Sequence, residues 1–295
     1  MKAGEGVRAY NHHKGFRTEP ERNAKERMIM ALFRVTYFSN ALAGQTDVCV
    51  VLPNDVPPMM SQMNPHYARP MKTLVLLHGF SGGPWDWITG SNIQELAGAY
   101  NLAVIMPNGR NSFYLDREPT GEAYATFVGE EVLEYARRSF GLSRKAEDTF
   151  IGGFSMGGFG ALHTGMAFSH NYSKIAALSS ALIIHQLRHM TPQDKNPIAN
   201  LAYYRDIFGD LQTAHLRDCN PEVLIQKKLA AGEKLPGIFM ACGTEDFLIE
   251  PNRAFAAFLK DRNVDFVYKE SSGVHNWKFW NEYTEPAIRW MLDEV

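Results

Sequence analysis

The sequence lacks the features that mark several protein classes. Its 295 residues include three cysteines, Cys49, Cys219 and Cys242, which are too few and too scattered for a disulfide framework or a zinc site. The formal net charge is −2, so no excess of one sign indicates a nucleic-acid or membrane partner. No apolar run approaches the about 18 residues of a membrane-spanning helix. We expect a globular protein with neither partner and no metal, and we interpret Cys49 and Cys242 as buried thiols because each lies in an apolar run.

The N-terminal segment lacks a recognisable pattern as well. Residues 1–27 are polar and have neither the apolar core nor the cleavage site of a secretion signal, so the expected compartment is the cytoplasm. The pair His12-His13 is interpreted as part of a solvated tail. We therefore expect a flexible extension over residues 1–29 and a single domain over residues 30–295.

From residue 31 onwards, short apolar runs alternate with helical patterns. Runs rich in β-branched and aromatic residues predict strands over 31–39, 47–52, 72–77, 102–106, 149–152, 174–179, 237–242 and 265–270. Helical spacing of apolar residues predicts helices over 91–100, 124–140, 251–262 and 276–292, the last with a kink near Pro286. This alternation predicts an α/β fold with a mostly parallel central sheet and helices on both faces.

Two stretches interrupt the alternation. Residues 53–70 contain five prolines and are predicted to form a loop. Residues 182–235 have weak periodicity and short helical patches, and we interpret them as a small cap-like insertion over the strand ends. In a parallel sheet, ligands bind at the carboxyl ends of the strands, so catalytic and binding residues are expected directly after each strand.

The stretch 149–162, TFIGGFSMGGFGAL, is the strongest functional signal in the chain. An apolar strand leads into Gly153-Phe154-Ser155-Met156-Gly157, the G-x-S-x-G pattern of a nucleophile elbow, and a helical pattern follows. Glycines must flank the serine because the tight strand-to-helix turn leaves no room for side chains. The free N–H groups and positive dipole end of the following helix suit an oxygen that gains negative charge. We therefore predict that Ser155 is a nucleophile.

A serine nucleophile needs a base and an acid, and both are found after later strands. Asp246 follows the predicted strand 237–242, and His275 follows the strand 265–270. His275 would accept the proton of Ser155, and Asp246 would orient the imidazole. Glu245 is the alternative acid, since only one of the two neighbouring carboxylates can point at His275, and Asp246 is preferred.

Other acids and histidines have weaker settings. The predicted insertion holds residues with no strand to position them: Asp194, Asp206, Asp210, Asp218, His185, His189 and His215. His163 lies inside the helix after Ser155 and is interpreted as a packed, structural residue, and His170 also lacks a strand end. His185 is kept as a residue that lines a substrate pocket.

The oxyanion hole of such a site needs two backbone N–H donors. One is predicted to come from Met156, the residue after the nucleophile, and the other from the loop after the strand 72–77. In that loop Phe80 is the preferred donor and Ser81 the alternative, while His78 is interpreted as a residue that organises the loop. Four aromatic residues in loops after strands are predicted to contact substrate, with packing inside the loops as the alternative for each: Trp85, Trp87, Phe113 and Tyr114.

Taken together, these motifs resemble the esterase D-like branch of the α/β-hydrolase superfamily. The similarity rests on LVLLHGFSGGPWDW, VIMPNGRNSFYLD, FIGGFSMGGFGAL, ACGTEDFL and SGVHNWKFW, in this order, from about residue 30 to the C-terminus. The pattern is most similar to tributyrin, feruloyl and acetyl esterases, in which the residues matching Ser155, Asp246 and His275 form the catalytic triad. S-formylglutathione hydrolases of this branch usually carry a cysteine in the loop after the His-Gly pair, and residues 80–86 contain none.

The resemblance implies an α/β-hydrolase fold and hydrolysis of carboxylic esters through an acyl-enzyme, with no metal or organic cofactor. We expect acetyl to butyryl or hydroxycinnamoyl (feruloyl) esters, including acylated saccharides, because the insertion is too short and polar for a lipase lid. An acyltransferase with the same triad, an S-formylglutathione hydrolase and a non-catalytic binding protein remain alternatives. The family also implies a homodimer or homotetramer.

Overall fold

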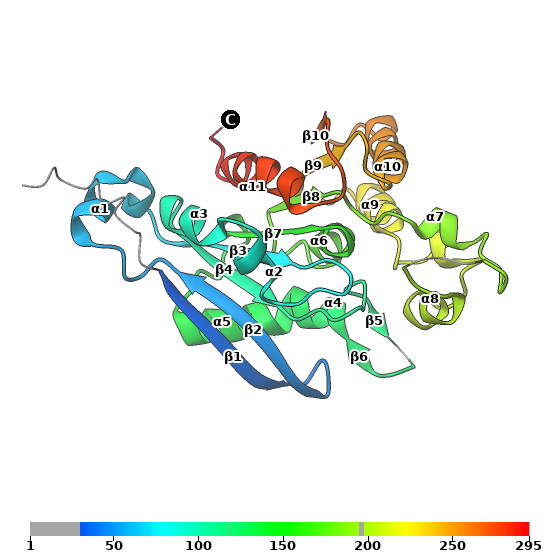
Figure 1. Cartoon of the computed structure of the whole chain (residues 1–295), viewed down its shortest axis with the longest axis horizontal. Helices are drawn as coiled ribbons and strands as arrows, with labels where there is room; N and C mark the ends of the chain where they lie inside the picture. Colours follow the sequence, from blue (N-terminus) through cyan, green and yellow to red (C-terminus); the bar gives the residue numbers. More distant parts are fainter. Residues whose placement is uncertain (1–29, 118, 195–197, 295) are drawn as a thin grey trace, which may run out of the picture.

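The computed structural model describes residues 30–117, 119–194 and 198–294, so the extension predicted for residues 1–29 lies outside the described part. An eight-stranded sheet runs through the middle of the molecule in the order β1-β2-β4-β3-β7-β8-β9-β10 (Figure 1). Its strands are β1 (Ala31–Ser39), β2 (Gly44–Leu52), β3 (Lys72–Leu77), β4 (Leu102–Pro107), β7 (Thr149–Phe154), β8 (Lys174–Leu178), β9 (Gly237–Gly243) and β10 (Phe266–Ser271).

The pairing of these strands confirms the predicted fold class. Strand β2 pairs antiparallel with both β1 and β4. From β4 to β10 every neighbouring pair is parallel, so the carboxyl ends of six strands meet at one edge of the sheet. The loops that leave these ends are the ones in which the sequence predicts chemistry.

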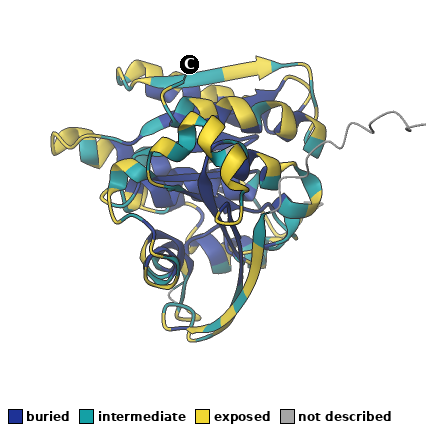
Figure 2. Ribbon diagram, turned by 90° about the vertical axis from the view of Figure 1, so that its left-hand side faces the viewer, coloured by how far each residue is buried: buried dark blue, intermediate teal, exposed yellow. Residues whose placement is uncertain are grey.

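Alternating side chains place one hydrophobic core on each face of the sheet. In β3, Val75 and Leu77 belong to one cluster, while Leu74 and Leu76 belong to the other. A strand points successive side chains to opposite faces, so a run of apolar residues is expected only where both faces are covered. Figure 2 shows the inner strands as buried, between helices whose outer faces are exposed.

Helices cover both faces. The cluster around Val75 includes residues of α5 (Val132–Phe140), α6 (Met156–Ala167) and α10 (Ile249–Asp261). The opposite cluster includes residues of α2 (Asp86–Gly90), α3 (Ile93–Ala99) and α11 (Trp277–Met291). Pro286 lies inside α11, as predicted.

The helix predicted over 124–140 has a more complex form. It consists of α4 (Tyr124–Thr126), a π-helical turn η2 (Phe127–Glu131) and α5 in direct succession. A π-helical turn disturbs the regular backbone ladder and frees carbonyl groups for other donors. Here the carbonyls of Val128 and Gly129 accept hydrogen bonds from the side chains of Tyr172 and Asn171, at 2.7 and 2.9 Å. These partners come from the loop before β8, which the local pattern of residues 124–140 does not reveal.

Other short elements were absent from the sequence prediction. The stretch 53–70, predicted as a loop, contains α1 (Pro58–Met63) and the 3₁₀ helix η1 (Pro65–Ala68). A small hairpin, β5 (Asp116–Arg117) and β6 (Glu122–Ala123), precedes α4. The 3₁₀ turn η3 (Ala146–Asp148) leads into β7. The prolines at the starts of α1 and η1 are compatible with a first helical turn, which explains how a proline-rich stretch holds helices.

The segment 182–235 forms short helices beside the sheet, at the right of Figure 1. They are α7 (Ile184–Leu187), α8 (Leu201–Phe208), the 3₁₀ turn η4 (Ala214–Leu216) and α9 (Pro221–Ala230). Helix α8 reaches the loops at the strand ends through Tyr203, whose hydroxyl donates to the carbonyl of Asn111 at 2.6 Å. The Tyr203 ring also packs edge-on against Phe80, with 5.5 Å between ring centroids.

Cys49 and Cys242 are buried free thiols, and burial raises their pKa values to about 11 and about 12. The thiols therefore stay protonated at neutral pH. Among the described helices, none has both the length and the apolar character needed to cross a membrane.

We predict that Leu162→Ala in α6 lowers the free energy of unfolding by about 2–5 kcal/mol, because the buried side chain leaves a cavity against the sheet. The matched control is Leu216→Ala, since Leu216 is exposed and its truncation should change stability by less than about 0.5 kcal/mol. Urea denaturation measures both. Equal losses in the two variants would contradict the assigned core.

Candidate active site

The turn between β7 and α6 holds Ser155 in a strained backbone conformation. Its φ is 56° and its ψ is −121°, a combination that residues with side chains rarely adopt. A Cβ on Gly153 would lie 2.4 Å from the carbonyl oxygen of Gly157, and a Cβ on Gly157 would lie 2.3 Å from that of Leu77. Backbone atoms cannot move aside as a flexible side chain can. The two glycines of the elbow are therefore required by space.

The structure brings Ser155, His275 and Asp246 together, although each follows a different strand. Nε2 of His275 lies 2.9 Å from Oγ of Ser155, and Nδ1 lies 2.8 Å from Oδ2 of Asp246. An ionised carboxylate only accepts hydrogen bonds, so Nδ1 carries the proton and Nε2 presents its lone pair to the serine hydroxyl. This is the arrangement in which histidine can take a proton from serine.

The surroundings of Asp246 keep it ionised. Burial pushes the pKa of this carboxyl upward, but the hydrogen bond and charge of His275 and the N–H of Leu248 outweigh it, and the pKa lies below its ordinary value. The Leu248 N–H donates to Oδ1 at 2.9 Å, so each carboxylate oxygen has its own donor. A buried carboxylate with both oxygens engaged holds the imidazole in one orientation.

Glu245 has a different place from its neighbour. Its Oε2 accepts a hydrogen bond from the N–H of Gly273 at 2.5 Å, and its own N–H donates to the Gly273 carbonyl at 3.1 Å. The first of these bonds, with help from Thr244 and Ser272, lowers the pKa of Glu245. Asp246 thus contacts the imidazole, as preferred from the sequence, while Glu245 holds the loop that carries His275.

The loop after β3 is organised by His78, in agreement with its interpretation from the sequence. This residue is buried, and burial lowers its pKa, so it stays neutral. Nδ1–H donates to the Gly79 carbonyl at 2.8 Å, and Nε2 accepts from the Gly109 N–H at 2.9 Å. With both ring nitrogens engaged, His78 links the loops after β3 and β4.

Hydrogen bonding separates the two donors considered for the oxyanion hole. The Ser81 N–H already donates to Oδ1 of Asn111 at 2.7 Å. Within the described part of the chain, the Phe80 N–H has no acceptor. Met156 is the first residue of α6, so its N–H has no acceptor within the helix. Phe80 and Met156 therefore remain our predicted donors.

The structure corrects the prediction that Trp87, Phe113 and Tyr114 contact substrate, because all three are buried in the cores. Trp87 Nε1 donates to the Leu77 carbonyl at 3.1 Å, and the Tyr114 hydroxyl donates to the His78 carbonyl at 3.0 Å. These two side chains support the backbone that leads into the predicted oxyanion loop. Phe113 packs against other buried aromatic rings, including Phe159.

Trp85 and His185 are the other two residues predicted to contact substrate. Trp85 is half-buried at the start of α2 and packs against the core that contains α11. His185 is exposed, pairs with Glu222 at 2.8 Å, and lines a cavity of about 210 Å³ with residues such as Leu182 and Phe255. The structure therefore leaves substrate contact by Trp85 and His185 as predictions.

Three residues at the site were missed in the sequence. Asn111 holds the predicted oxyanion loop through its bond to the Ser81 N–H, Tyr203 packs on Phe80, and Trp280 packs edge-on against His275 at 5.1 Å. Asn111 and Trp280 lie within two of the motifs that carry the family resemblance, which was the available signal. Tyr203 lies in the irregular segment, where no pattern distinguishes it.

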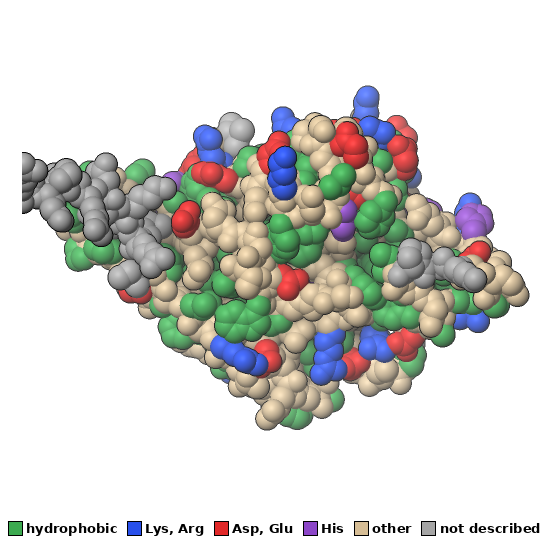
Figure 3. Space-filling model, viewed as in Figure 1, with side chains coloured by type: hydrophobic (Ala, Val, Ile, Leu, Met, Phe, Trp, Pro, Cys, Tyr) green, Lys and Arg blue, Asp and Glu red, His purple; other side chains and the backbone are tan. Residues whose placement is uncertain are grey.

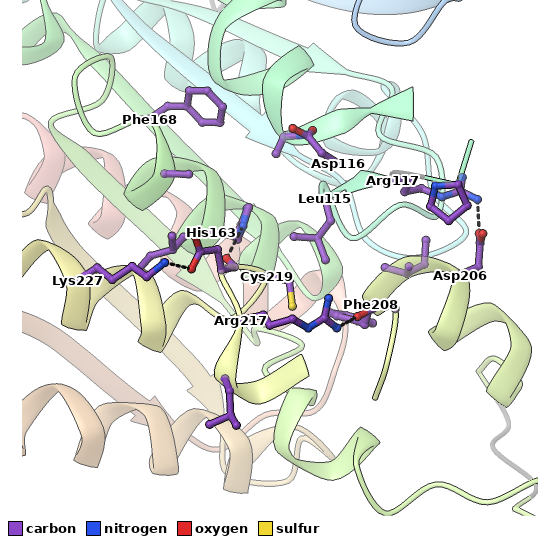
Figure 4. Close-up of a pocket in the computed structure, with 18 residues that line it drawn as sticks. Leu115, Asp116, Arg117, His163, Phe168, Asp206, Phe208, Arg217, Cys219 and Lys227 are labelled. Atoms are coloured by element: carbon purple, nitrogen blue, oxygen red, sulfur yellow. Dashed lines mark hydrogen bonds and ion pairs between the residues drawn. The ribbon is translucent and has the colours of Figure 1, made fainter. Parts of the chain in front are cut away.

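A second cavity, of about 880 Å³, lies toward the other end of α6 and is not lined by the triad (Figure 4). His163 is part of its wall and donates from Nε2 to the Asp218 carbonyl at 3.0 Å. Figure 4 shows the cations of the wall turned to oxygen atoms of the same wall: Arg117 to Asp206, Lys227 to Asp218 and Arg217 to the Phe208 carbonyl. The interpretation of His163 as a structural residue agrees with this packing.

A family model described as "Putative esterase" matches residues 39–290. An acetyl esterase from Caldicellulosiruptor saccharolyticus is 42% identical over 262 residues, which cover 89% of this chain and 98% of that protein.

Two solved structures from Staphylococcus aureus are also similar. The fluorophosphonate-binding serine hydrolase F, with substrate bound, aligns with a TM-score of 0.77 and 29% identity, covering 89% of this chain and 98% of that one. An S-formylglutathione hydrolase, as apoenzyme, aligns with a TM-score of 0.75 and 29% identity, covering 90% and 99%.

The two neighbouring carboxylates give a test of the site. We predict that Asp246→Asn lowers kcat for p-nitrophenyl acetate by about 10⁴-fold, because an amide no longer fixes the tautomer in which Nε2 accepts a proton. Glu245→Gln keeps an acceptor for the Gly273 N–H and should lower kcat by about tenfold or less. Steady-state kinetics of the two variants measures the difference. A larger loss for Glu245→Gln would reverse the assignment of the acid.

His163 gives a prediction about pH. Burial lowers its pKa from 6.5 to about 4, so between these values the unfolded chain binds a proton that the native protein does not. The contribution of His163 to the free energy of unfolding is therefore fully present above pH 6.5. About 3 kcal/mol of it is lost as the pH falls toward 4. In His163→Gln, the fall in unfolding free energy between pH 7 and pH 4 should shrink by about this amount. The exposed His170→Gln is the control, and the same pH slope in wild type and His163→Gln would refute the assignment.

Proposed function

The chain belongs to the family of putative esterases, and we propose that it is a serine esterase that cleaves short-chain acyl esters through an acyl-enzyme. The observation that carries the proposal is the position of His275, within hydrogen-bond distance of both Ser155 and Asp246. A base in this position can activate serine and later deliver the proton to a leaving group. The family membership supports esters as the bond that is cleaved.

In the first half of the proposed reaction, Ser155 attacks the ester carbonyl carbon while Nε2 of His275 takes the hydroxyl proton. Negative charge develops on the carbonyl oxygen, and the N–H groups of Met156 and Phe80 would stabilise it. The positively charged imidazole then gives its proton to the alcohol oxygen, and the carbon–oxygen bond of the ester breaks. Asp246 stabilises the imidazolium throughout, without taking its proton.

In the second half, water replaces the alcohol. His275 takes a proton from the water, which attacks the acyl-enzyme carbonyl, and the same N–H donors would stabilise the second oxyanion. The proton then returns to Ser155 Oγ as the acid leaves. Apart from the substrate and water, these reaction steps use only side chains and backbone groups of the chain.

The acyl group is proposed to be short. An acetyl esterase is among the relatives, which supports acetyl esters as substrates. Butyryl and hydroxycinnamoyl esters, including those of saccharides, are kept in the proposal from the sequence resemblance. A panel of p-nitrophenyl esters from acetate to octanoate, run beside methyl ferulate and acetylated xylo-oligosaccharides, orders these substrates by kcat/KM.

Thioester hydrolysis is a second candidate, supported by the likeness to an S-formylglutathione hydrolase. The same triad chemistry would cleave the carbon–sulfur bond of S-formylglutathione. Residues 80–86, where such enzymes usually carry a cysteine, contain none, which favours the oxygen ester. The comparison of kcat/KM for S-formylglutathione and p-nitrophenyl acetate decides between them, and product analysis with added alcohols distinguishes acyl transfer from hydrolysis.

We predict that Ser155→Ala abolishes turnover of p-nitrophenyl acetate, because the nucleophile is lost, while the circular dichroism spectrum stays that of the wild type. A fluorophosphonate probe should label the wild type and not the variant, as mass spectrometry of the intact protein measures. Ser173→Ala is a suitable control, since Ser173 lies before β8 rather than at its carboxyl end. Retained turnover in Ser155→Ala, or no labelling of the folded wild type, would refute a serine esterase and favour a non-catalytic protein.

A further inference from the structure

Two large apolar side chains are exposed directly beside His275. Phe247 is 64% exposed and follows Asp246 in the chain, and Val274 is 47% exposed and precedes His275. In the view of Figure 1 the loop before α11 comes down near the start of α6, and Figure 3 shows hydrophobic side chains gathered around a histidine in this area. Apolar groups that gather in solvent beside a polar catalytic site are a candidate binding surface.

The Phe247 ring contacts the imidazole itself. Its centroid lies 4.7 Å from that of His275, with an angle of 50° between the ring planes. The other aromatic neighbour of the imidazole, Trp280, is buried, so it fixes the histidine from within the protein. Phe247 instead presents its free surface to solvent beside the imidazole.

The exposed ring is held in place by its chain neighbours. Asp246 and Leu248 on either side are buried, and the Leu248 N–H is bonded to the Asp246 carboxylate. Asn252 donates to the carbonyls of Leu248 and Ser180, both at 2.8 Å, which ties this loop to the one after β8. A side chain on a fixed backbone loses little freedom when it binds a ligand.

The chemistry determines which part of the substrate lies next to this ring. In the proposed reaction His275 delivers a proton to the alcohol oxygen, so that oxygen must come within hydrogen-bond distance of Nε2. The carbonyl oxygen instead points to the N–H donors of Met156 and Phe80, which come from other loops. The group attached to the alcohol oxygen is therefore the part of the ester nearest to Phe247 and Val274.

We propose that Phe247, together with Val274, forms the leaving-group subsite and selects esters whose alcohol carries a ring with a flat apolar face. This inference rests on the proposed esterase function and adds which side of the ester is selected. Such a face is shared by phenols and by the C–H faces of sugar rings, and a phenylalanine can stack on either. The acyl side of the substrate lies outside this subsite.

The test compares Phe247→Ala with Phe38→Ala. Phe38 is 62% exposed, nearly as much as Phe247, but it lies on β1 at the far edge of the sheet. For phenyl acetate we expect Phe247→Ala to raise KM about three- to tenfold with little change in kcat, because stacking is lost equally from ground and transition states. For ethyl acetate, which has the same acyl group and no ring, KM should change less than about twofold. Phe38→Ala should match the wild type with both esters.

Two further arms sharpen the result. An acetylated methyl xyloside shows whether the sugar face is bound as well as the phenyl ring, since a similar rise in KM would assign both kinds of alcohol to the subsite. Phenyl butyrate tests the acyl side, and Phe247→Ala should raise its KM by the same factor as for phenyl acetate. Fluorophosphonate labelling of Ser155 verifies that the variant keeps an assembled site, and Phe247→Leu serves if the alanine variant does not fold.

Specific outcomes would overturn the inference. Equal rises in KM for ethyl and phenyl acetate in Phe247→Ala would show that the subsite does not select a ring. A rise in KM that grows with the length of the acyl chain would show that Phe247 contacts the acyl group instead. A loss of kcat with every ester would show that Phe247 positions His275 and binds no leaving group. Failure of the wild type to hydrolyse any ester would instead refute the proposed function, so the two failures are distinguishable.

Discussion

The pair of hydrogen bonds made by His275 is the interaction on which the site depends. It joins the loops after β7, β9 and β10, and both bonds are shorter than 3 Å. Neither ring nitrogen could be oriented by local sequence alone, because the partners lie 29 and 120 residues away in the chain. The parallel sheet brings the three residues together, since the loops that carry them all leave the same edge of the sheet. The bonds between Glu245 and Gly273 hold the loop that carries His275, and the buried carboxylate of Asp246 holds the imidazole itself.

The predicted oxyanion loop is supported in a different way, by buried side chains that bond its backbone. Trp87 and Tyr114 donate to the carbonyls of Leu77 and His78, and the His78 ring links this loop to the one after β4. All three side chains are buried, where unpaired polar groups would be costly, so each hydrogen bond also fixes a conformation. The predicted donor of this loop, the Phe80 N–H, is thus carried on backbone whose other side packs against the hydrophobic core.

The fold and the family could be predicted because their signals are local. A buried parallel strand is an apolar run with turn-forming residues at its ends. The glycines of the elbow belong to one pattern of five consecutive residues. The π-helical turn η2 was missed because its carbonyls are bonded by Tyr172 and Asn171 from another loop. Helix α1 was missed because its stretch is rich in proline, which favours a loop prediction. The aromatic residues show the limit most clearly. Trp87, Phe113 and Tyr114 follow strands, as substrate contacts would, yet they point into the core, while Phe247, not considered from the sequence, is the exposed ring beside His275.

By itself, the sequence determined the order of the eight main-sheet strands along the chain, the glycine-flanked position of Ser155 and the two later loops that carry an acid and a base. These are properties of residue type and spacing along the chain. Tertiary structure alone decided that Asp246 rather than Glu245 contacts the imidazole, that Ser81 gives its N–H to Asn111, and which aromatic side chains reach solvent. The physical reason is that side-chain direction and burial follow from packing between segments far apart in the chain, and a linear pattern does not contain those contacts.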